Sequence, residues 1–252
     1  MTRDTTDLAG VRHDRYETLG STNAEALARA RAGERGPLWI SAAMQTGGRG
    51  RRGKSWVSPP GNLYATLLLT EPSPPALAPQ LSFVTGLAVH DAVVACAPDL
   101  AERVKLKWPN DLLLDGRKLS GMLIEAESQP RFSVAIGIGV NCVSHPADTG
   151  YGATDLQANG VSAAMDDLLA NLAAAMNVRL AQWAAGAGFA SIRNDWLDRA
   201  ASLGETIMVR LPERQLTGVF EGIDADGRLL IATPDNATET IAAGDVFALG
   251  TQ

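Results

Sequence analysis

The sequence predicts a unit that mixes helices and strands, followed by a small β-rich appendage. Two apolar segments indicate the mixed unit: the run Leu63–Thr70 is typical of a buried strand, and the longer run Leu81–Ala97 of a helix packed against a sheet. After Leu203 the sequence changes to short strands separated by turn signals, and about fifty residues of this kind predict a small β-barrel. We therefore expect two units, residues 1–202 and residues 203–252.

The composition is that of an ordinary globular protein. Its 252 residues are 46% apolar and 20% charged, which is enough for one sizeable core. The 28 acidic residues outnumber the 22 basic ones, and this balance argues against a protein whose main role is general nucleic-acid binding. Residues 203–252 carry eight acidic residues against three arginines, a net charge of -5, so this part is the least suited to nucleic acid.

Cysteine usage and apolar patterning exclude several other classes. Cys96 and Cys142 are isolated, so we expect no disulfide framework, and no Cys/His set has zinc-ligand spacing; which residues would hold a metal is unknown from the sequence. The first residues lack the apolar segment of a secretion signal, and no apolar run approaches the ~18–20 residues of a membrane span. We expect a cytoplasmic protein that makes no membrane contact.

The elements of the first unit follow from apolar periodicity and turn residues. Residues 1–13 are expected to form a short polar lead, and Asp115-Gly116 marks a hairpin turn. The order predicted after the lead is a strand at Arg15–Thr18, a helix that begins after Ser21-Thr22-Asn23, strands at Leu38–Ala43 and Leu63–Thr70, a proline-rich connection, the helix Leu81–Ala97, strands at Val104–Lys107, Leu112–Leu114, Arg117–Glu127 and Phe132–Val140, a polar loop over 142–160, and helices at Ser162–Ala185 and Phe189–Ala201.

The segment Thr46–Trp56, TGGRGRRGKSW, stands out from the rest of the chain, and we call it the cationic loop. It contains no acid in a protein whose formal charge is -6. Glycine lets the backbone approach a ligand closely, and arginine binds phosphate or carboxylate oxygens in pairs. The segment therefore suits an anion with several oxygens, although a solvated surface loop of this composition is the alternative. Its glycines and cations are Gly47, Gly48, Gly50, Gly53, Arg49, Arg51, Arg52 and Lys54.

The cationic loop also fits the phosphate-loop pattern G-x-x-x-x-G-K-[ST], from Gly48 to Ser55. That pattern binds phosphate only when a helix follows directly, because the N-terminus of the helix helps to hold the phosphates. Here Pro59-Pro60-Gly61 follows instead and cannot form such a helix. We therefore reject a phosphate-loop nucleotidase and keep the anion-binding interpretation in another fold.

Two glycines in the strand that ends at Val140 are a second unusual feature. Gly137 and Gly139 are two residues apart and so point to the same face of the strand. Glycine weakens a strand, so a pair on one face indicates close approach of a ligand or of another backbone. A bulge or a tight crossing of two segments is the alternative.

Five motifs occur in order between Ser21 and Asn141. They are Ser21-Thr22-Asn23, Gln45 with the cationic loop, Lys107-Trp108-Pro109-Asn110-Asp111, Lys118-Leu119-Ser120-Gly121, and GIGVN at 137–141. Together they resemble the biotin protein ligase family. The resemblance implies an α+β fold in which a central mixed β-sheet, of the class II synthetase-like type, is flanked by helices, with a small SH3-like β-barrel at the C-terminus. It extends over nearly the whole chain.

The resemblance also implies two reactions and their substrates. Biotin attacks the α-phosphate of ATP, bound with Mg²⁺, to give biotinyl-5′-AMP and pyrophosphate. A lysine of a biotin carboxyl carrier protein domain then displaces AMP. Carboxylate and triphosphate repel each other, so the first reaction needs several fixed cations, which Arg49, Arg51 and Lys118 can supply.

The resemblance assigns residue roles motif by motif. Lys118, Arg49 and Asp111 are the expected catalytic residues, and the last of these meets the acceptor lysine. The residues expected to bind biotin are Ser21, Thr22, Asn23, Gln45, Arg49, Gly50, Arg51, Lys118 and Gly121. Those expected to bind ATP or the adenylate are Arg49, Arg51, Trp56, Asn110, Lys118 and Asn141.

Structural alternatives exist for several of these residues. Ser21 and Thr22 are good helix caps, and caps often have no other role. Asp111 is also suited to a turn after Trp108-Pro109-Asn110, and Trp56 is also suited to a core. His90 lies in an apolar helix, where a structural or surface role is the expectation.

The order of the motifs favours a single-function enzyme. The polar lead leaves no room for the N-terminal helix-turn-helix of the repressors in this family, so we expect no DNA binding. The oligomeric state is left open, with a homodimer as one alternative. A lipoate protein ligase, similar in fold and in acyl-adenylate chemistry, is the enzyme alternative. A non-catalytic regulator that binds biotin or the adenylate is the alternative from another class. We also expect the cationic loop to become ordered over biotin and ATP.

Overall fold

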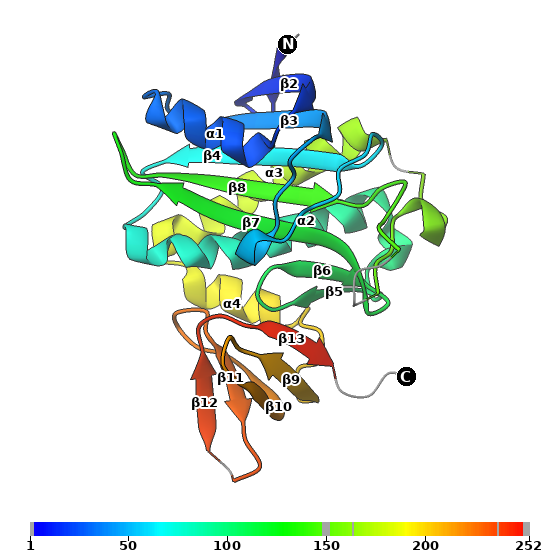
Figure 1. Ribbon diagram of the computed structural model, residues 1–252, viewed down its shortest axis with the longest axis vertical. Coiled ribbons are helices and arrows are strands. Elements are labelled where there is room, and N and C mark those ends of the chain that lie inside the picture. The colour runs from blue at the N-terminus through cyan, green and yellow to red at the C-terminus, as the bar shows by residue number, and fades with distance from the viewer. Residues whose placement is uncertain (1–2, 148–151, 163, 236, 249–252) are drawn as a thin grey trace.

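The first two hundred residues build an eight-stranded mixed sheet (Figure 1). The computed structural model describes residues 3–147, 152–162, 164–235 and 237–248. In the sheet β2 and β3 pair in parallel, and every other pair of neighbours is antiparallel. The strands in spatial order are β1 (Arg3–Leu8), β2 (Val11–Leu19), β3 (Leu38–Gln45), β4 (Leu63–Thr70), β8 (Ser133–Val140), β7 (Arg117–Glu127), β6 (Asp111–Leu114) and β5 (Val104–Lys107).

Helices cover both faces of this sheet, as Figure 1 shows. One face carries α1 (Thr22–Arg31), which contacts β3, β4, β8 and β7. The other face carries α2 (Leu81–Cys96), and α3 (Met165–Trp183) packs on α2. The helix α4 (Phe189–Leu197) packs on α2 and α3. The predicted mixed sheet flanked by helices is therefore confirmed.

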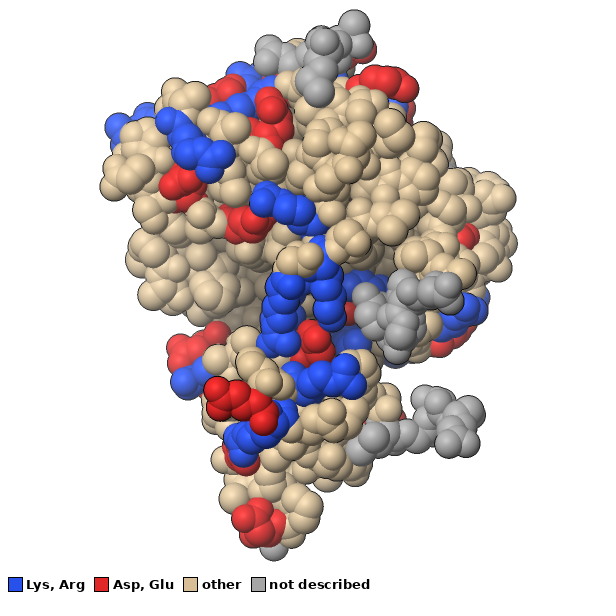
Figure 2. Space-filling view, in the orientation of Figure 1, with Lys and Arg blue, Asp and Glu red and all other residues tan. Residues whose placement is uncertain are grey.

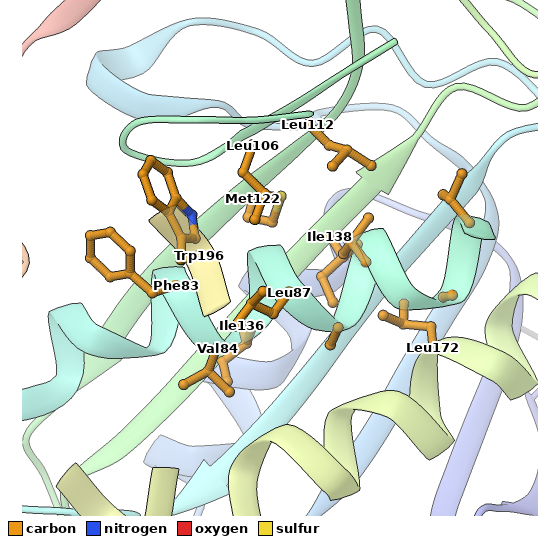
Figure 3. Packing of buried hydrophobic residues seen from close by; sticks show 14 of the residues in the cluster. Phe83, Val84, Leu87, Leu106, Leu112, Met122, Ile136, Ile138, Leu172 and Trp196 are labelled. Carbon is orange, nitrogen blue, oxygen red and sulfur yellow. The ribbon is translucent and has the colours of Figure 1, made fainter. Parts of the chain in front are cut away.

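The alternation of side chains along β3 explains the two cores. Leu38 and Ile40 point towards α1, whereas Trp39 between them belongs to the larger core on the α2 side. In the larger core the aromatic rings of Phe83 and Trp196 meet edge to face, with centroids 5.4 Å apart. Figure 3 shows how this core surrounds α2 between the sheet and the other two helices.

The helix α2 is apolar almost all round because it is enclosed on several sides. With the preceding 3-10 helix it forms the segment Pro75–Cys96, which is long and apolar enough to cross a membrane by length and composition. The expectation that no segment reaches this length was therefore wrong. However, 72% of the most apolar 18-residue stretch of this segment is buried inside the protein, so its apolar character is that of a core helix.

Two expectations about the ends of the chain need correction. The described part of the polar lead forms the edge strand β1, which pairs with β2. An edge strand with mostly exposed side chains lacks the apolar alternation by which strands are predicted. The C-terminal strands form an open sheet, not a closed barrel. Its order is β12 (Thr238–Ile241), β11 (Leu229–Ala232), β10 (Gln215–Ile223), β9 (Thr206–Arg210) and β13 (Asp245–Ala248).

The open C-terminal sheet packs against the rest of the chain. The indole nitrogen of Trp108 donates to the carbonyl of Gly227 at 3.0 Å, and the apolar residues of both sheets belong to one continuous core. Alternation of apolar and polar residues along these strands predicts one covered face, but it does not predict closure. In the structure α4 and Trp108, between β5 and β6, contact the C-terminal sheet. The division of the chain at 202/203 stays a prediction.

Candidate active site

A cleft opens where the cationic loop, β6, β7 and the C-terminal sheet meet. It encloses about 980 Å³ of empty space, with open solvent at its mouth included. Figure 2 shows lysine and arginine side chains gathered on this face, between the upper part of the molecule and the C-terminal sheet. Of the residues expected at the site, all but Asn141 line the cleft: Ser21, Thr22, Asn23, Gln45, Arg49, Gly50, Arg51, Trp56, Asn110, Asp111, Lys118 and Gly121.

The start of α1 forms one polar end of the cleft. The Ser21 hydroxyl accepts from the backbone N–H of Ala24, so it is the predicted N-cap as well as a lining residue. The backbone N–H of Thr22 donates to Gln45 Oε1 at 2.8 Å, and Gln45 Nε2 donates to Ser58 Oγ at 3.1 Å. Ser21 therefore caps α1 and lines the cleft at the same time.

Asn23 crosses from α1 to the sheet and is held at both ends of its amide. Its Oδ1 lies 2.7 Å from the Thr66 hydroxyl, and its Nδ2 donates to Glu125 Oε2 at 2.8 Å. A Cβ atom at Gly137 would lie 2.3 Å from Asn23 Oδ1, so only glycine leaves room for this amide. Gly137 is therefore explained by a side chain that crosses it, which was not among the expected reasons.

The cationic loop folds back on itself as a small hairpin. Arg49 and Ser55 form an isolated antiparallel bridge, and the N–H groups of Gly50 and Trp56 donate to the carbonyls of Lys54 and Gly48. No helix follows the loop before β4, so the rejection of a phosphate loop is confirmed. The hairpin presents its cations towards the cleft and towards the C-terminal sheet.

Each arginine on the cleft side of the loop has a fixed partner. Arg49 pairs with Glu125 at 3.1 Å, and Arg51 donates to Asn110 Oδ1 at 3.1 Å. Burial lowers the pKa of Arg51, and the neighbouring charge of Arg52 lowers it further. Asn110 in turn donates to the Met122 carbonyl at 2.6 Å, which ties the loop to β7.

Lys118 and Lys107 approach the same carboxylate. Lys118 Nζ lies 2.6 Å from Asp111 Oδ1, and Lys107 Nζ lies 3.9 Å from Asp111 Oδ2. Lys118 and Asp111 each expose only 13% of their side chains. Burial lowers the pKa of Lys107; Asp111 opposes this shift, whereas Lys118 adds to it.

Trp56 lies across glycines of β7 and β8. A Cβ atom at Gly139 would lie 2.6 Å from its indole ring, and one at Gly121 would lie 3.0 Å from it. Lys118 Nζ lies 5.4 Å from the ring centroid, within the range of a cation–π contact. The indole nitrogen is buried and has no hydrogen-bond partner among the described residues. Gly139, like Gly137, accommodates a side chain.

Comparisons with known proteins identify the family of this chain. A profile described as the biotin/lipoate A/B protein ligase family matches residues 13–141, and one described as the biotin protein ligase C terminal domain matches residues 202–249. The chain is 45% identical to the biotin–[acetyl-CoA-carboxylase] ligase of Paracoccus denitrificans, over 90% of this chain and 96% of that protein. This chain belongs to the biotin/lipoate A/B protein ligase family.

Other members of this family agree with the assignment. The ligase of Mycobacterium tuberculosis is 34% identical over 91% of this chain and 86% of its own. Among solved structures, the biotin protein ligase of Aquifex aeolicus in complex with biotin and ATP superposes with a TM-score of 0.78 at 27% identity. That match covers 95% of this chain and 99% of the Aquifex chain. The Leishmania major ligase in complex with biotinyl-5-AMP gives a TM-score of 0.66 at 27% identity, covering 91% and 98% of the two chains.

Residues of the C-terminal sheet were missed when the family motifs were read from the sequence. Asp245, Val246 and Phe247 of β13 line the cleft. Asp245 lies 3.2 Å from Lys54 Nζ and 3.6 Å from Arg52 Nη1. Burial would raise the pKa of Asp245, but the hydrogen bond from Lys54 and the charges around it hold the pKa below its usual range. Asp245 lies in a segment with many acidic residues, so nothing in the sequence distinguished it as a partner of the cationic loop.

Asn141 is buried behind the cleft and does not line it. Its Nδ2 donates to the Thr154 carbonyl at 3.0 Å, and its carbonyl accepts from Leu156 N–H at 3.1 Å. Its backbone N–H also donates to the Leu119 carbonyl of β7 at 2.9 Å. The expected contact of Asn141 with nucleotide stays a prediction. His90 lies in α2 outside the cleft, beside Asp91. No cluster of three potential metal ligands occurs within the described residues.

The close contact between Gly139 and Trp56 gives a direct structural test. In Gly139→Ala the added methyl group must displace the indole, so we expect a shift of the Trp56 indole N–H resonance in protein labelled with nitrogen-15 at tryptophan. Gly20→Ala is the matched control, because nothing lies within 4 Å of a Cβ atom there. An unchanged Trp56 resonance in Gly139→Ala would contradict this packing.

Proposed function

We propose that this protein activates biotin with ATP, giving biotinyl-5′-AMP, and transfers biotin to a lysine of a biotin carboxyl carrier protein domain. The observation that supports this most is the convergence of Arg49, Arg51 and Lys118 on one cleft whose far end is lined by Ser21 and Gln45. The named relatives are biotin–[acetyl-CoA-carboxylase] ligases. The chain's own residues fit both half-reactions, as follows.

The polar end of the cleft suits the ureido ring of biotin. That ring offers two N–H donors and one carbonyl acceptor, and it needs partners of both kinds. The Ser21 and Thr22 hydroxyls and the Gln45 amide supply both kinds within one short stretch of the cleft wall. The apolar rest of biotin would then lie along the part of the cleft wall that β7 and β8 form, which includes Leu123.

The first half-reaction is limited by the repulsion between biotin's carboxylate and the triphosphate. A carboxylate oxygen attacks the α-phosphorus, the bond to the β-phosphate oxygen breaks, and pyrophosphate leaves. Arg49, Arg51 and Lys118 lower the barrier by fixing positive charge where negative charge develops. We take ATP to enter as its Mg²⁺ complex, so the cation comes with the nucleotide.

The second half-reaction needs a neutral amine at the acyl carbon of the adenylate. The acceptor lysine arrives as an ammonium ion, which is not a nucleophile until it loses a proton. Asp111 is the carboxylate nearest the reacting groups, and in the free protein it is paired with Lys118. Once Lys118 turns to the acyl phosphate, Asp111 becomes available to orient the incoming amine or to receive its proton.

We further propose that the partner is the carrier domain of a biotin-dependent carboxylase and that the enzyme acts in the cytoplasm. The relatives' names mention acetyl-CoA carboxylase. Residues 203–252 carry eight acidic residues against three arginines, so DNA is not among the expected partners.

A labelling experiment separates this function from its two alternatives. The protein is incubated with ATP, a purified carrier domain, and either biotin or lipoate. We expect covalent biotin on one carrier lysine, dependent on ATP, and little lipoylation. Lipoylation without biotinylation would establish the lipoate ligase, and tight biotin binding without pyrophosphate release would establish the non-catalytic regulator.

Lys118→Ala should slow adenylate formation by at least ~10²-fold, the scale expected when one electrostatic catalytic group is lost. The measurement is pyrophosphate release with biotin and ATP alone, without the carrier. Lys105→Ala is the control, because Lys105 lies on β5 and does not line the cleft. Near-normal turnover of Lys118→Ala would remove Lys118 from the mechanism.

Asp111→Asn should impair transfer more than adenylate formation, because the amide keeps the shape of the carboxylate but is no base for the acceptor amine. Transfer is measured separately by mixing preformed biotinyl-5′-AMP with the carrier domain. Equal losses in both half-reactions would show that Asp111 acts mainly by holding Lys118.

A further inference from the structure

Lys118 lies in the part of β7 that extends beyond its pairing with β8. The last pair between β7 and β8 is Ser120 with Val140, so β8 no longer flanks Lys118. A later segment takes over that position: Lys118 N–H donates to the Gly152 carbonyl at 2.8 Å, and Thr154 N–H donates to the Lys118 carbonyl at 3.0 Å. The backbone of Lys118 is thus fixed on this side by residues 152–154 and not by the sheet.

Several contacts hold residues 152–154 in place, among them the hydrogen bond that Asn159 Nδ2 donates to Thr154 Oγ1 at 2.9 Å. Asn141 binds the Thr154 carbonyl through its side chain. Next to it, His145 Nδ1 lies 2.6 Å from Asp155 Oδ2, and the other carboxylate oxygen of Asp155 accepts from Ala158 N–H at 2.6 Å. Asp155 is only 4% exposed. A carboxylate oxygen accepts, so we take the N–H of His145 as the donor in this contact.

We propose that the His145–Asp155 pair is a positioning device for Lys118. The pair joins the chain just after β8 to the chain just after residues 152–154, so it fixes the segment that completes the pairing of Lys118. The inference rests on the proposed function, in which Lys118 acts on the carboxylate and the acyl phosphate. Neither His145 nor Asp155 lines the cleft, so neither touches the reacting atoms.

Lys118 needs such positioning because its ammonium group must be placed accurately over a short distance. Its ammonium group has to leave Asp111, 2.6 Å away, and reach the reacting oxygens beside it. A displacement of about 1 Å at such a group costs up to about 100-fold in rate. Loss of the N–H from His145 also leaves a buried carboxylate with one partner fewer, which favours movement of residues 152–155.

The first test measures backbone position without any reaction. In His145→Ala we expect faster hydrogen exchange at the amides of Lys118 and Thr154, measured in the ligand-free protein. His145→Asn should restore protection, because its side-chain amide can place an N–H where Nδ1 stands. Unchanged exchange at both amides in His145→Ala would overturn the proposal, whether or not the protein proves to be a biotin ligase.

The second test is a double-mutant cycle on pyrophosphate release. His145→Ala should lower kcat by about 10-fold to 100-fold in the otherwise unchanged protein, but by less than about 2-fold in the Lys118→Ala background. The KM for biotin should stay the same, because the Ser21 and Gln45 end of the cleft is untouched. Equal losses in both backgrounds would mean a general structural role and would reject the proposal.

Lys105→Ala provides the matched control for both tests. Lys105 pairs with Leu113 across β5 and β6, and Leu113 pairs with Lys118 across β6 and β7, so Lys105 lies two strands from Lys118 on its other side. Lys105 does not line the cleft. We expect normal exchange and normal turnover. If this variant matched His145→Ala in either measurement, any disturbance near Lys118 would suffice and the specific role of His145 would fall.

Discussion

The mutual repulsion of the cations in the cleft is the constraint around which the rest of the site is arranged. Positive charges placed close together in a half-buried cleft destabilise the folded protein unless each has a partner. Each group of cations here meets an oxygen from a different element: Arg49 with Glu125 on β7, Lys118 and Lys107 with Asp111 on β6, and Arg52 and Lys54 with Asp245 on β13. An anionic ligand with several oxygens can take over the role of these carboxylates.

The sheet topology explains how partners so far apart in sequence come together. The cationic loop leaves β3 and returns to β4, which lies beside β8, and β8 lies beside β7. Glycines 121, 137 and 139 have no side chain to project from this part of the sheet. The side chains of Trp56 and Asn23 can therefore lie directly against its backbone. A β-branched or bulky residue at 121 or 139 would displace Trp56 and with it the cationic loop, whereas one at 137 would displace the Asn23 side chain.

The regular parts of this architecture were predictable from local pattern. The strands at Leu63–Thr70, Val104–Lys107 and Arg117–Glu127 begin and end where expected, because apolar continuity or alternation and a marked turn define both ends. The edge strand β1 was missed because its polar, exposed residues resemble a loop. Closure of the C-terminal sheet was wrongly expected, because short alternating strands fit an open sheet packed on a helix equally well.

The site was predictable only as far as its motifs reach. The polar end at Ser21 and Gln45, the loop arginines and Lys118 were all named from the sequence, and they line one cleft. Two features of the site could not be predicted from local sequence patterns. Gly137 and Gly139 predicted close approach, but not that Asn23 and Trp56 approach them, because the partners are set by how α1 and the loop cross the sheet. Asp245 lies in a segment with no motif at all.

The position of Asp245 changes the meaning of the acidic C-terminal sheet. From composition alone, its negative charge only argues against nucleic acid. In the folded protein the same charge places a carboxylate beside Arg52 and Lys54, whose side chains point away from the polar end of the cleft. Both contacts are more than a third exposed on the cationic side, so each contributes little to stability. Their consequence is orientation: a weak, reversible contact can hold the cationic loop towards the cleft without competing strongly with a triphosphate for its arginines.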